Sequence, residues 1–497
     1  MLSLVILSLS LLMIIVSAEL PDQRPAKDKR TYTSSVIDNV IDELVGLFED
    51  PNIARIFSNC WPNTLDTTVA AYDFTDPSKL DSFIITGDIY ALWLRDSQNQ
   101  VQAYIPYAVN DTNLTNLIEG LIQRQANSII LDSFANAFNY NASGEGHQND
   151  QRKPPMKPYI FEGKYELDSL MSFLKLSYWH YRYSGDKALK QFVNKDWLTA
   201  VASVLKTVNT MQIDDGQTEN PPYTFERLAD SALETLPLSG RGFPVQPFGL
   251  SRQLFRPSDD AVTHGYNLPG NMMACVELKH LSELLQVIGG EQKLKSDADK
   301  IGSEICGAIA EVLKISQKLD TVIPYEVDGY GGSIFMDDAN VPSLLSIPIL
   351  GFMSNSHNIY KKTRDRVFSL SNPYFYKGIS GFGIGGPHEG RNYAWPMSLI
   401  VAAMTSNNDE EITELLNILK TTTANTGLMH EAFNVKDSFD FTRSWFAWAN
   451  GLFGELILQL IVTKPKLLLK DDPDIIKKAQ ALVKIPVSLQ VQLDLDQ

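Results

Sequence analysis

The feature that most constrains the fold of this chain is a succession of amphipathic helical patterns. Apolar residues recur three and four positions apart along most of the sequence, which is typical of helices with one buried face. A first such pattern covers Val36 to Phe57. The later ones cover approximately Leu92–Val109, Leu114–Asp132, Glu166–Ser184, Lys190–Gln212, Met272–Gly289, Glu291–Leu319, Ser343–Phe352, Tyr360–Ser369, Trp395–Thr405, Asp409–Thr422 and Trp445–Thr463.

So many helices, without runs of buried strands, predict an all-α protein. We expect paired helices closed into a toroid, the (α/α)6 barrel class. A helical repeat protein is the alternative, but the sequence has no fixed period. Long loops rich in glycine, proline and aromatic residues separate the helices, and loops of this length are usually functional. They are expected to gather at one end as the active-site face, and they cover Ala137–Tyr165, Asp214–Arg256, Pro324–Pro342 and Asn372–Trp395.

Length and charge bound the organisation and the partners. With 497 residues, 44% of them hydrophobic, the chain can bury a large core. We expect a signal peptide at 1–18, a flexible lead-in at 19–34, one catalytic domain at 35–463 and a C-terminal extension at 464–497. A formal net charge of −16 argues against a nucleic-acid partner, because phosphate binding needs a basic surface.

The N-terminus points to the secretory pathway. Leu2–Val16 is an apolar run of signal-peptide length, and Val16-Ser17-Ala18 is a small-residue cleavage pattern. The run lacks a basic n-region, so a signal-anchor is the alternative, although it is short for a membrane span. Three sequons, at Asn110, Asn113 and Asn141, fit the same route. We expect a secreted or lumenal protein without a stable membrane span, and leave its oligomeric state open.

The three cysteines, Cys60, Cys275 and Cys306, are too few for a disulfide scaffold. They allow one disulfide and one free thiol, and the sequence does not choose the pair. Their spacing excludes a zinc finger, and the chain has no HExxH, P-loop or GxSxG motif. The sequence therefore predicts neither a metal nor a cofactor.

Two adjacent acids in a central loop, Asp259 and Asp260, stand out as catalytic candidates. They follow Arg256 and precede the Pro-Gly signal of the next helix. In an extended loop, neighbouring side chains point to opposite sides, so only one acid would face a substrate. The other would pair with Arg256 or cap the helix. Taken alone, such a pair is more often an ordinary turn and N-cap.

Three further clusters place carboxylates beside aromatic rings, the composition of a carbohydrate cleft. Trp93, Arg95 and Asp96 begin a helix, where a helix-end ion pair is an equally good interpretation. The other two clusters lie in glycine-bounded loops, where a His-Glu pair alone is more often structural. They contain His388, Glu389 and Trp395 in the first loop, and His430 and Glu431 in the second.

Together the clusters resemble a known family, the metal-independent exo-α-1,6-mannosidases of glycoside hydrolase family 125. The resemblance covers about Ile53 to Leu460, in the family's order. The matching stretches are TGDIYALWLRDS (86–97), RQANSIILDSFANAFN (124–139), KYELDSL (164–170), FRPSDDA (255–261), MDDANVPSLL (336–345), NPYFYKG (372–378), YAWPM (393–397), MHEAF (429–433) and SWFAWANGLFGELIL (444–458).

The resemblance implies an (α/α)6 barrel and an inverting hydrolysis that needs no metal. It implies that the general acid is Asp259 or Asp260, with Asp259 preferred, and that the general base is Glu431. The acid should have a raised pKa and the base should be ionised. Glu389 has no expected role. The residues expected to bind mannose-containing glycans are Trp93, Arg95, Asp96, Arg256, Asn271, His388, Trp395 and His430.

Two alternatives stay open. One is another glycosidase or sugar-modifying enzyme on the same barrel, such as an α-glucosidase or a sugar epimerase. The other is an inactive glycan-binding protein that keeps the cleft. Substrate assays separate the first from a mannosidase, and a sensitive hydrolysis assay separates the second.

Overall fold

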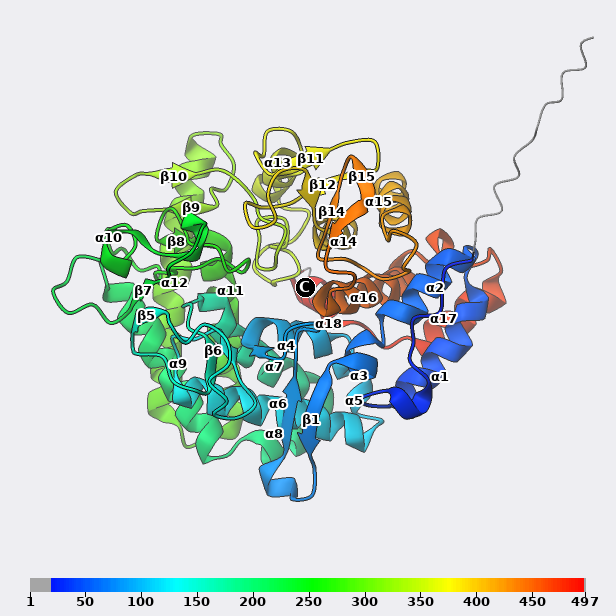
Figure 1. The fold of residues 1–497 in the computed structure, drawn as a ribbon, viewed down its shortest axis with the longest axis horizontal. Helices are drawn as coiled ribbons and strands as arrows, with labels where there is room; N and C mark the ends of the chain where they lie inside the picture. The colour runs from blue at the N-terminus through cyan, green and yellow to red at the C-terminus, as the bar shows by residue number, and fades with distance from the viewer. Residues whose placement is uncertain (1–18, 496–497) are drawn as a thin grey trace, which may run out of the picture.

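The structure is a computed structural model that describes residues 19–495. The predicted signal peptide at 1–18 lies outside the described residues. Within them, helices form the body and short antiparallel strands lie in the connections (Figure 1). No helix of this described part is both long and apolar enough to traverse a lipid bilayer.

A set of inner helices lies around the centre of the molecule (Figure 1). They are α4 (Leu94–Gln102), α7 (Leu167–Ser184), α11 (Leu268–Ile288), α14 (Pro396–Met404) and α16 (Ala447–Thr463). The helix α7 packs against both α4 and α11, and α16 packs against both α4 and α14. The helices α14 and α16 are hydrophobic on all sides, and both are buried along nearly their whole length. A helix without a polar face is expected in such an inner position.

A second set of helices covers the inner ones from outside. The helix α2 (Pro51–Cys60) packs on α16, α6 (Thr112–Leu131) on α7, α12 (Gln292–Lys318) on α11, and α15 (Asp409–Thr421) on α14. The helix α9 (Lys195–Ile213) contacts both α6 and α12. The remaining helices are α1 (Ser35–Leu44), α3 (Asn63–Thr67), α5 (Ile105–Ala108), α8 (Asp186–Phe192), α10 (Pro237–Gly240), α13 (Asn358–Val367), α17 (Pro473–Leu482) and α18 (Val487–Leu495).

The strands form six small antiparallel sheets among the described residues. In order along each sheet these are β1-β2, β3-β4-β6, β5-β7, β10-β9-β8, β11-β12 and β13-β14-β15. The bounds are β1 (Val69–Asp73), β2 (Asp81–Ile84), β3 (Leu92–Trp93), β4 (Ala137–Phe138), β5 (Gln151–Lys153), β6 (Ile160–Glu162), β7 (Thr224–Glu226), β8 (Tyr266–Asn267), β9 (Glu326–Val327), β10 (Ser333–Ile334), β11 (Phe375–Lys377), β12 (Phe382–Ile384), β13 (Tyr393–Ala394), β14 (Ala432–Asn434) and β15 (Asp437–Thr442). Strands β3, β8 and β13 lead directly or within one residue into α4, α11 and α14, so the sheets lie at the N-terminal ends of inner helices.

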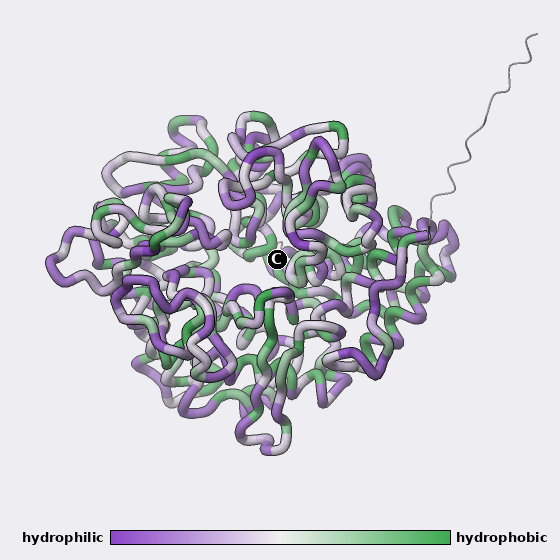
Figure 2. Tube along the Cα trace, viewed as in Figure 1, coloured by the Kyte–Doolittle hydropathy of each residue, from purple (hydrophilic) through white to green (hydrophobic). Residues whose placement is uncertain are grey.

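One connected cluster of buried apolar side chains runs from Tyr32 to Val491. Hydrophobic stretches concentrate in the interior, and much of the periphery is hydrophilic (Figure 2). A disulfide between Cys275 of α11 and Cys306 of α12 joins an inner helix to its outer neighbour, and Cys60 is free and buried. The structure therefore identifies Cys275 and Cys306 as the disulfide pair, which the sequence alone does not determine.

Four expected helices differ in the structure. The pattern at Leu92–Val109 forms β3, α4 and α5, and the pattern at Lys190–Gln212 covers the end of α8 and most of α9. The pattern at Val36–Phe57 forms α1 and α2, separated near Gly46 because Asp50 caps a new helix that begins at Pro51. The segment 343–352, expected to be a helix, forms a series of turns. Pro348 has no N–H for a helical hydrogen bond, and the Asp337 carboxylate accepts hydrogen bonds from the Leu344 and Leu345 N–H groups.

The two ends of the described chain are tied to the body. Residues 19–34, expected to be a flexible lead-in, are held because Arg24 forms ion pairs with Asp38 and Asp66, as Arg30 also does. The C-terminal extension forms α17 and α18, and both pack on α16.

Candidate active site

A cavity opens at the N-terminal ends of α4, α14 and α16. The positive ends of these helix dipoles favour negative charge there. The cavity is lined by Thr86, Asp88, Ile89, Trp93, Arg95, Asp96, Pro257, Ser258, Asp259, Asn340, His388, Trp395, Glu431, Arg443, Phe446 and Trp448.

A tight turn separates the two central acids. Phe255 pairs with Ala261 as an isolated bridge, and the Arg256 N–H donates to the Asp260 carbonyl at 2.8 Å. Between them Asp259 has φ 67°, in the left-handed region that a residue other than glycine seldom adopts. The Asp259 side chain lines the cavity and is 24% exposed. The expected extended loop is therefore a turn, but it still directs only one acid to the cavity.

Asp260 points away from the cavity and orients a histidine. Its carboxylate accepts a hydrogen bond from His388 Nδ1 at 3.1 Å, and the Asp260 side chain is 1% exposed. Burial would lower the pKa of His388, but the hydrogen bond and charge of Asp260, with Asp259 and Glu431, raise it to about 10. His388 is thus a cation at neutral pH, attracted to the carboxylates of both Asp259 and Glu431.

Glu431 lies directly before β14, and its side chain is only 7% exposed. Its Oε2 accepts from Arg443 Nε at 2.9 Å. Burial raises the pKa of Glu431 to about 8, and the neighbouring Glu389 carboxyl group raises it as well. The positive charge of Arg443 lowers this pKa, but its effect is smaller. Glu431 was expected to be ionised at neutral pH. A pKa of about 8 contradicts this, and Glu389, which had no expected role, contributes to the difference.

Arg95 contacts four carboxylates, of which Asp96 and Asp259 line the cavity and Glu166 and Asp168 lie behind it. Its guanidinium is 2.6 Å from Glu166, 3.3 Å from Asp259, 3.4 Å from Asp96 and 3.5 Å from Asp168. The arginine is 4% exposed, so the surroundings screen these interactions weakly. Burial raises the pKa of Asp96 to about 6 despite the Arg95 charge.

The pKa of Asp259 is lowered, although the general acid was expected to have a raised pKa. Burial raises the pKa of Asp259, but Arg95, Lys164 and a hydrogen bond to Glu166 reverse this, and its pKa lies below the ordinary value. Burial raises the pKa of Glu166 well above its ordinary value. Of Asp259 and Glu166, it is therefore Glu166 that retains a proton.

Aromatic rings form the rest of the cavity wall. Trp93, Trp395 and Trp448 line it, and their indole N–H groups have no hydrogen-bond partner within the described part of the chain. Indole rings can stack on the apolar faces of sugars. The wall is therefore suited to a carbohydrate.

Of the predicted site residues, the structure brings seven to the cavity: Trp93, Arg95, Asp96, Asp259, His388, Trp395 and Glu431. Three predicted sugar-binding residues, Arg256, Asn271 and His430, do not line this cavity. Arg256 is paired with Glu326 at 2.7 Å, where both are buried. Asn271 holds the backbone of Ser251, and His430 stacks on Phe441 while its Nδ1 bonds to the Arg443 carbonyl.

Sequence reasoning did not single out several residues of the site. Arg443 lies downstream of the Glu431 cluster in the sequence; its backbone has a left-handed φ of 46°, and its Nε donates to Glu431 at 2.9 Å. Asn340 follows two acids, and its amide is held by Asp338 at 3.0 Å. Glu166 sits at the start of a predicted helix, where an acid is usually a cap. No local signal distinguishes it from one.

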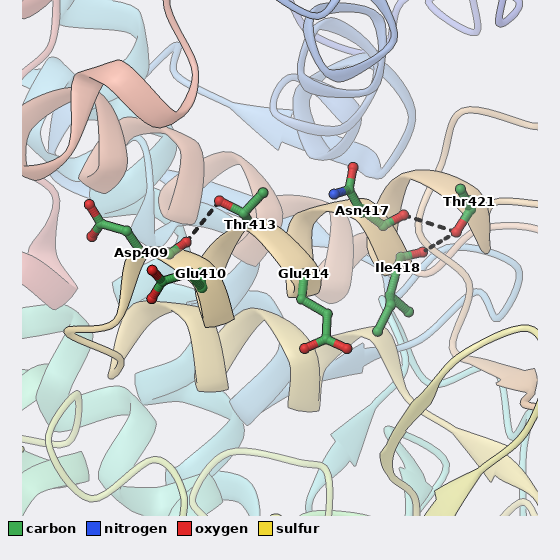
Figure 3. Close-up of a pocket in the computed structure, with 7 residues that line it drawn as sticks. All are labelled: Asp409, Glu410, Thr413, Glu414, Asn417, Ile418 and Thr421. Atoms are coloured by element: carbon green, nitrogen blue, oxygen red, sulfur yellow. Dashed lines mark hydrogen bonds between the residues drawn. The ribbon is translucent and has the colours of Figure 1, made fainter.

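A second hollow lies beside α15, but it offers no convergent chemistry. Figure 3 shows that its side chains all come from this one helix. The hydroxyl groups of Thr413 and Thr421 donate to carbonyls of the same helix, at Asp409 and Asn417. We assign no site there.

Two groups of three side chains have donor atoms within 4.8 Å of one another, Glu234-Asp260-His388 and His388-Glu389-Glu431. His388 is common to both, and its interaction with Asp260 already makes it a cation. Both groups are explained as charge pairs around an imidazolium, and we assign no metal to either.

Comparison with known proteins identifies the family. Residues 50–458 match the metal-independent α-mannosidases, GH125. The chain is 45% identical over 468 residues to the meiotically up-regulated gene 157 protein of Schizosaccharomyces pombe, covering 91% of each. It is 33% identical, with a TM-score of 0.78, to a Streptococcus pneumoniae metal-independent α-mannosidase solved in a non-productive complex with α-1,6-mannobiose, covering 86% of this chain and 98% of that one. These findings confirm the resemblance seen in the sequence. The chain belongs to the metal-independent α-mannosidases of glycoside hydrolase family 125.

Proposed function

We propose that the protein removes terminal α-1,6-linked mannose from the non-reducing ends of glycans, with inversion and without a metal. The observation that carries this is the meeting of Asp259 and Glu431, which are far apart in the chain, in one aromatic-walled cavity. The solved relative bound to α-1,6-mannobiose supports the linkage.

In this proposal Asp259 protonates the departing oxygen and Glu431 takes a proton from the attacking water. Inversion requires the two carboxyl groups to lie on opposite sides of the sugar, with room for that water. His388, Arg95 and Asp96 bind the sugar hydroxyl groups, and the indole rings stack on its faces. Asp260 orients His388 and does not touch the substrate.

The test is incubation of the purified protein with α-1,6-, α-1,2- and α-1,3-linked mannobiose, followed by proton NMR of the released sugar. We expect cleavage of the α-1,6 linkage, β-mannose as the first product, and unchanged activity with EDTA. Preferential cleavage of α-glucosides would favour another glycosidase, and the absence of hydrolysis would favour a glycan-binding protein.

Glu431→Gln tests the base directly. We expect a loss of turnover of about 100-fold or more, while mannobiose still binds, because the amide cannot accept the water proton. Turnover is measured with mannobiose and binding by calorimetry. Near-normal turnover would remove Glu431 from the mechanism.

The architecture proposed is a closed (α/α)6 barrel, supported by the inner neighbours α4, α7, α11, α14 and α16 and their outer partners. The buried turns at 343–353 take the sixth inner position. Gly351 lies against Val276 of α11, which supports this.

The compartment proposed is the secretory pathway, with a secreted or lumenal product. The Cys275–Cys306 disulfide supports it, because such bonds persist in oxidising compartments. Asn110, Asn113 and Asn141 are exposed and thus accessible for glycosylation. An N-glycosidase should lower the apparent mass of the natural protein, and an unchanged mass would argue against glycosylation.

A further inference from the structure

A second carboxyl group lies directly behind Asp259. Glu166 immediately precedes α7, and its side chain is 0% exposed. The carboxyl groups of Glu166 and Asp259 lie next to each other, because Arg95 and the Asn136 amide each donate to both. Two carboxylates in such contact repel when both are charged, so the pair holds one proton between them.

The same two side chains hold both members of this pair. Arg95 donates to Glu166 at 2.6 Å and to Asp259 at 3.3 Å. The Asn136 amide donates to Glu166 at 3.0 Å and to Asp259 at 3.3 Å. Ser169 adds a third donor to Glu166, at 2.7 Å. Arg95 and Asn136 each make the shorter of their two bonds to Glu166. These donors stabilise the negative charge of Glu166 once its proton has left.

Access to the cavity differs between the two groups. The Asp259 side chain is 24% exposed and lines the cavity, whereas Glu166 is completely enclosed. Glu166 therefore cannot reach a glycosidic oxygen. Asp259 shares the donors Arg95 and Asn136 with Glu166 and lines the cavity, so it is the neighbouring group through which the proton of Glu166 can reach the cavity.

We propose that Glu166 is a positioning residue that stores the proton which Asp259 delivers to the leaving group. This rests on the proposed function. The proton moves from Glu166 to Asp259, and Asp259 passes it to the glycosidic oxygen as the bond from that oxygen to the anomeric carbon breaks. Water forms the new bond to the anomeric carbon and gives its proton to Glu431. Glu166 is left as a carboxylate held by Arg95, Asn136 and Ser169. Solvent later takes the proton from Glu431 and returns one through Asp259.

The charges around the pair are consistent with this direction of transfer. Burial raises the pKa of Glu166, and positive neighbours lower that of Asp259, so the proton rests on Glu166 in the free enzyme. The titratable and charged groups that face the pair are Arg95, Asp96, Lys164, Asp168 and His388.

The experiment compares two substrates in Glu166→Gln. The amide has the same shape and can still donate a hydrogen bond to Asp259, but it cannot release a proton. Mannobiose needs a proton on its departing oxygen, whereas an aryl α-mannoside with a dinitrophenol leaving group does not. We expect kcat for mannobiose to fall about 100-fold, and kcat for the aryl mannoside to change by less than about threefold. The basic limb of the pH profile for mannobiose should also move to lower pH.

Asp168→Asn is the matched control. Asp168 is also 0% exposed and lies 3.5 Å from Arg95, but its hydrogen bonds go to Arg95 and Gln253. We expect this variant to affect both substrates equally. An equal loss on both substrates in Glu166→Gln would overturn the proposal. Failure of the wild type to cleave mannobiose would instead overturn the proposed function.

Ser169→Ala keeps the proposal testable if Glu166→Gln does not fold. It removes one donor from the Glu166 carboxylate, which makes release of the proton harder. We expect kcat for mannobiose to fall about tenfold with the aryl mannoside unaffected. An unchanged ratio of the two kcat values in the folded variant would overturn the proposal.

Discussion

Asp259 and Asp260 are neighbours in the chain, but their carboxyl groups have different surroundings. The left-handed backbone at Asp259 directs one side chain into the cavity and the other toward His388. A residue held in this region is expected where the surrounding structure requires it, and such residues cluster at active sites.

These surroundings predict different effects of the two amide substitutions. Asp259→Asn should reduce kcat for mannobiose about 1000-fold, because the amide has no acidic proton to give to the departing oxygen, and a dinitrophenyl mannoside should restore turnover. Asp260→Asn should cost no more than about tenfold, because Asn can keep the contact with His388. Steady-state kinetics on both substrates check this, and a larger loss in Asp260→Asn would reverse the assignment.

Glu389 sets the pH range of the neighbouring base. Glu431 must be ionised to accept a proton, and its pKa of about 8 places that ionisation above neutral pH. Glu389→Gln removes the like charge, so the pKa of Glu431 should fall and the acidic limb of kcat/KM should move to lower pH. Glu410→Gln, on the exposed start of α15, is the control. A limb that stays in place would show that Glu389 does not act on Glu431.

At the scale of elements, the sequence predicts the helices well, because their apolar periodicity is long. The expected Glu166–Ser184 and Asp409–Thr422 patterns lie within a residue of α7 and α15. The failures have local causes. At 343–352 the apolar spacing is helical, but Pro348 interrupts the hydrogen bonds.

Site residues could be predicted from the sequence where they begin inner helices. They were harder to predict where the position of a side chain depends on a contact with a residue far away in the sequence. Trp93, Arg95 and Trp395 stand at helix starts beside the cavity. Arg256 looked equally suitable, but its partner Glu326 is 70 residues away in sequence. No local pattern reveals such a pairing.

The disulfide fastens α11 to α12, and its removal should affect stability more than activity. It closes a loop with a sequence separation of 31, for which about 2–4 kcal/mol of unfolding free energy is expected. The double variant Cys275→Ser, Cys306→Ser should lose this amount in urea unfolding and become insensitive to dithiothreitol. The wild type should lose a similar amount when reduced. Equal stability of the oxidised wild type and the double variant would contradict the expectation.

At the scale of the whole molecule, the C-terminal extension connects separate parts of the helical ring. The Lys484 N–H donates to the Tyr107 hydroxyl group of α5, and the Tyr183 hydroxyl group of α7 donates to the Ile485 carbonyl. The Ser488 N–H donates to Glu455 of α16 at 2.9 Å. The last helix is thus part of the body that supports the cavity.

Removal of residues 484–497 should therefore destabilise the entire domain. Val487, Leu489 and Val491 are each at most 5% exposed, and such burial is worth about 1.5–3 kcal/mol per side chain. The deletion also takes a hydrogen-bond donor from the carboxylate of Glu455, which is 1% exposed. We expect a loss of about 5 kcal/mol or more in unfolding free energy, measured by urea denaturation. Leu493→Ala, at a position that is 40% exposed, should cost less than about 1 kcal/mol. A truncated protein as stable as the full chain would mean that α18 lies on the ring without supporting it.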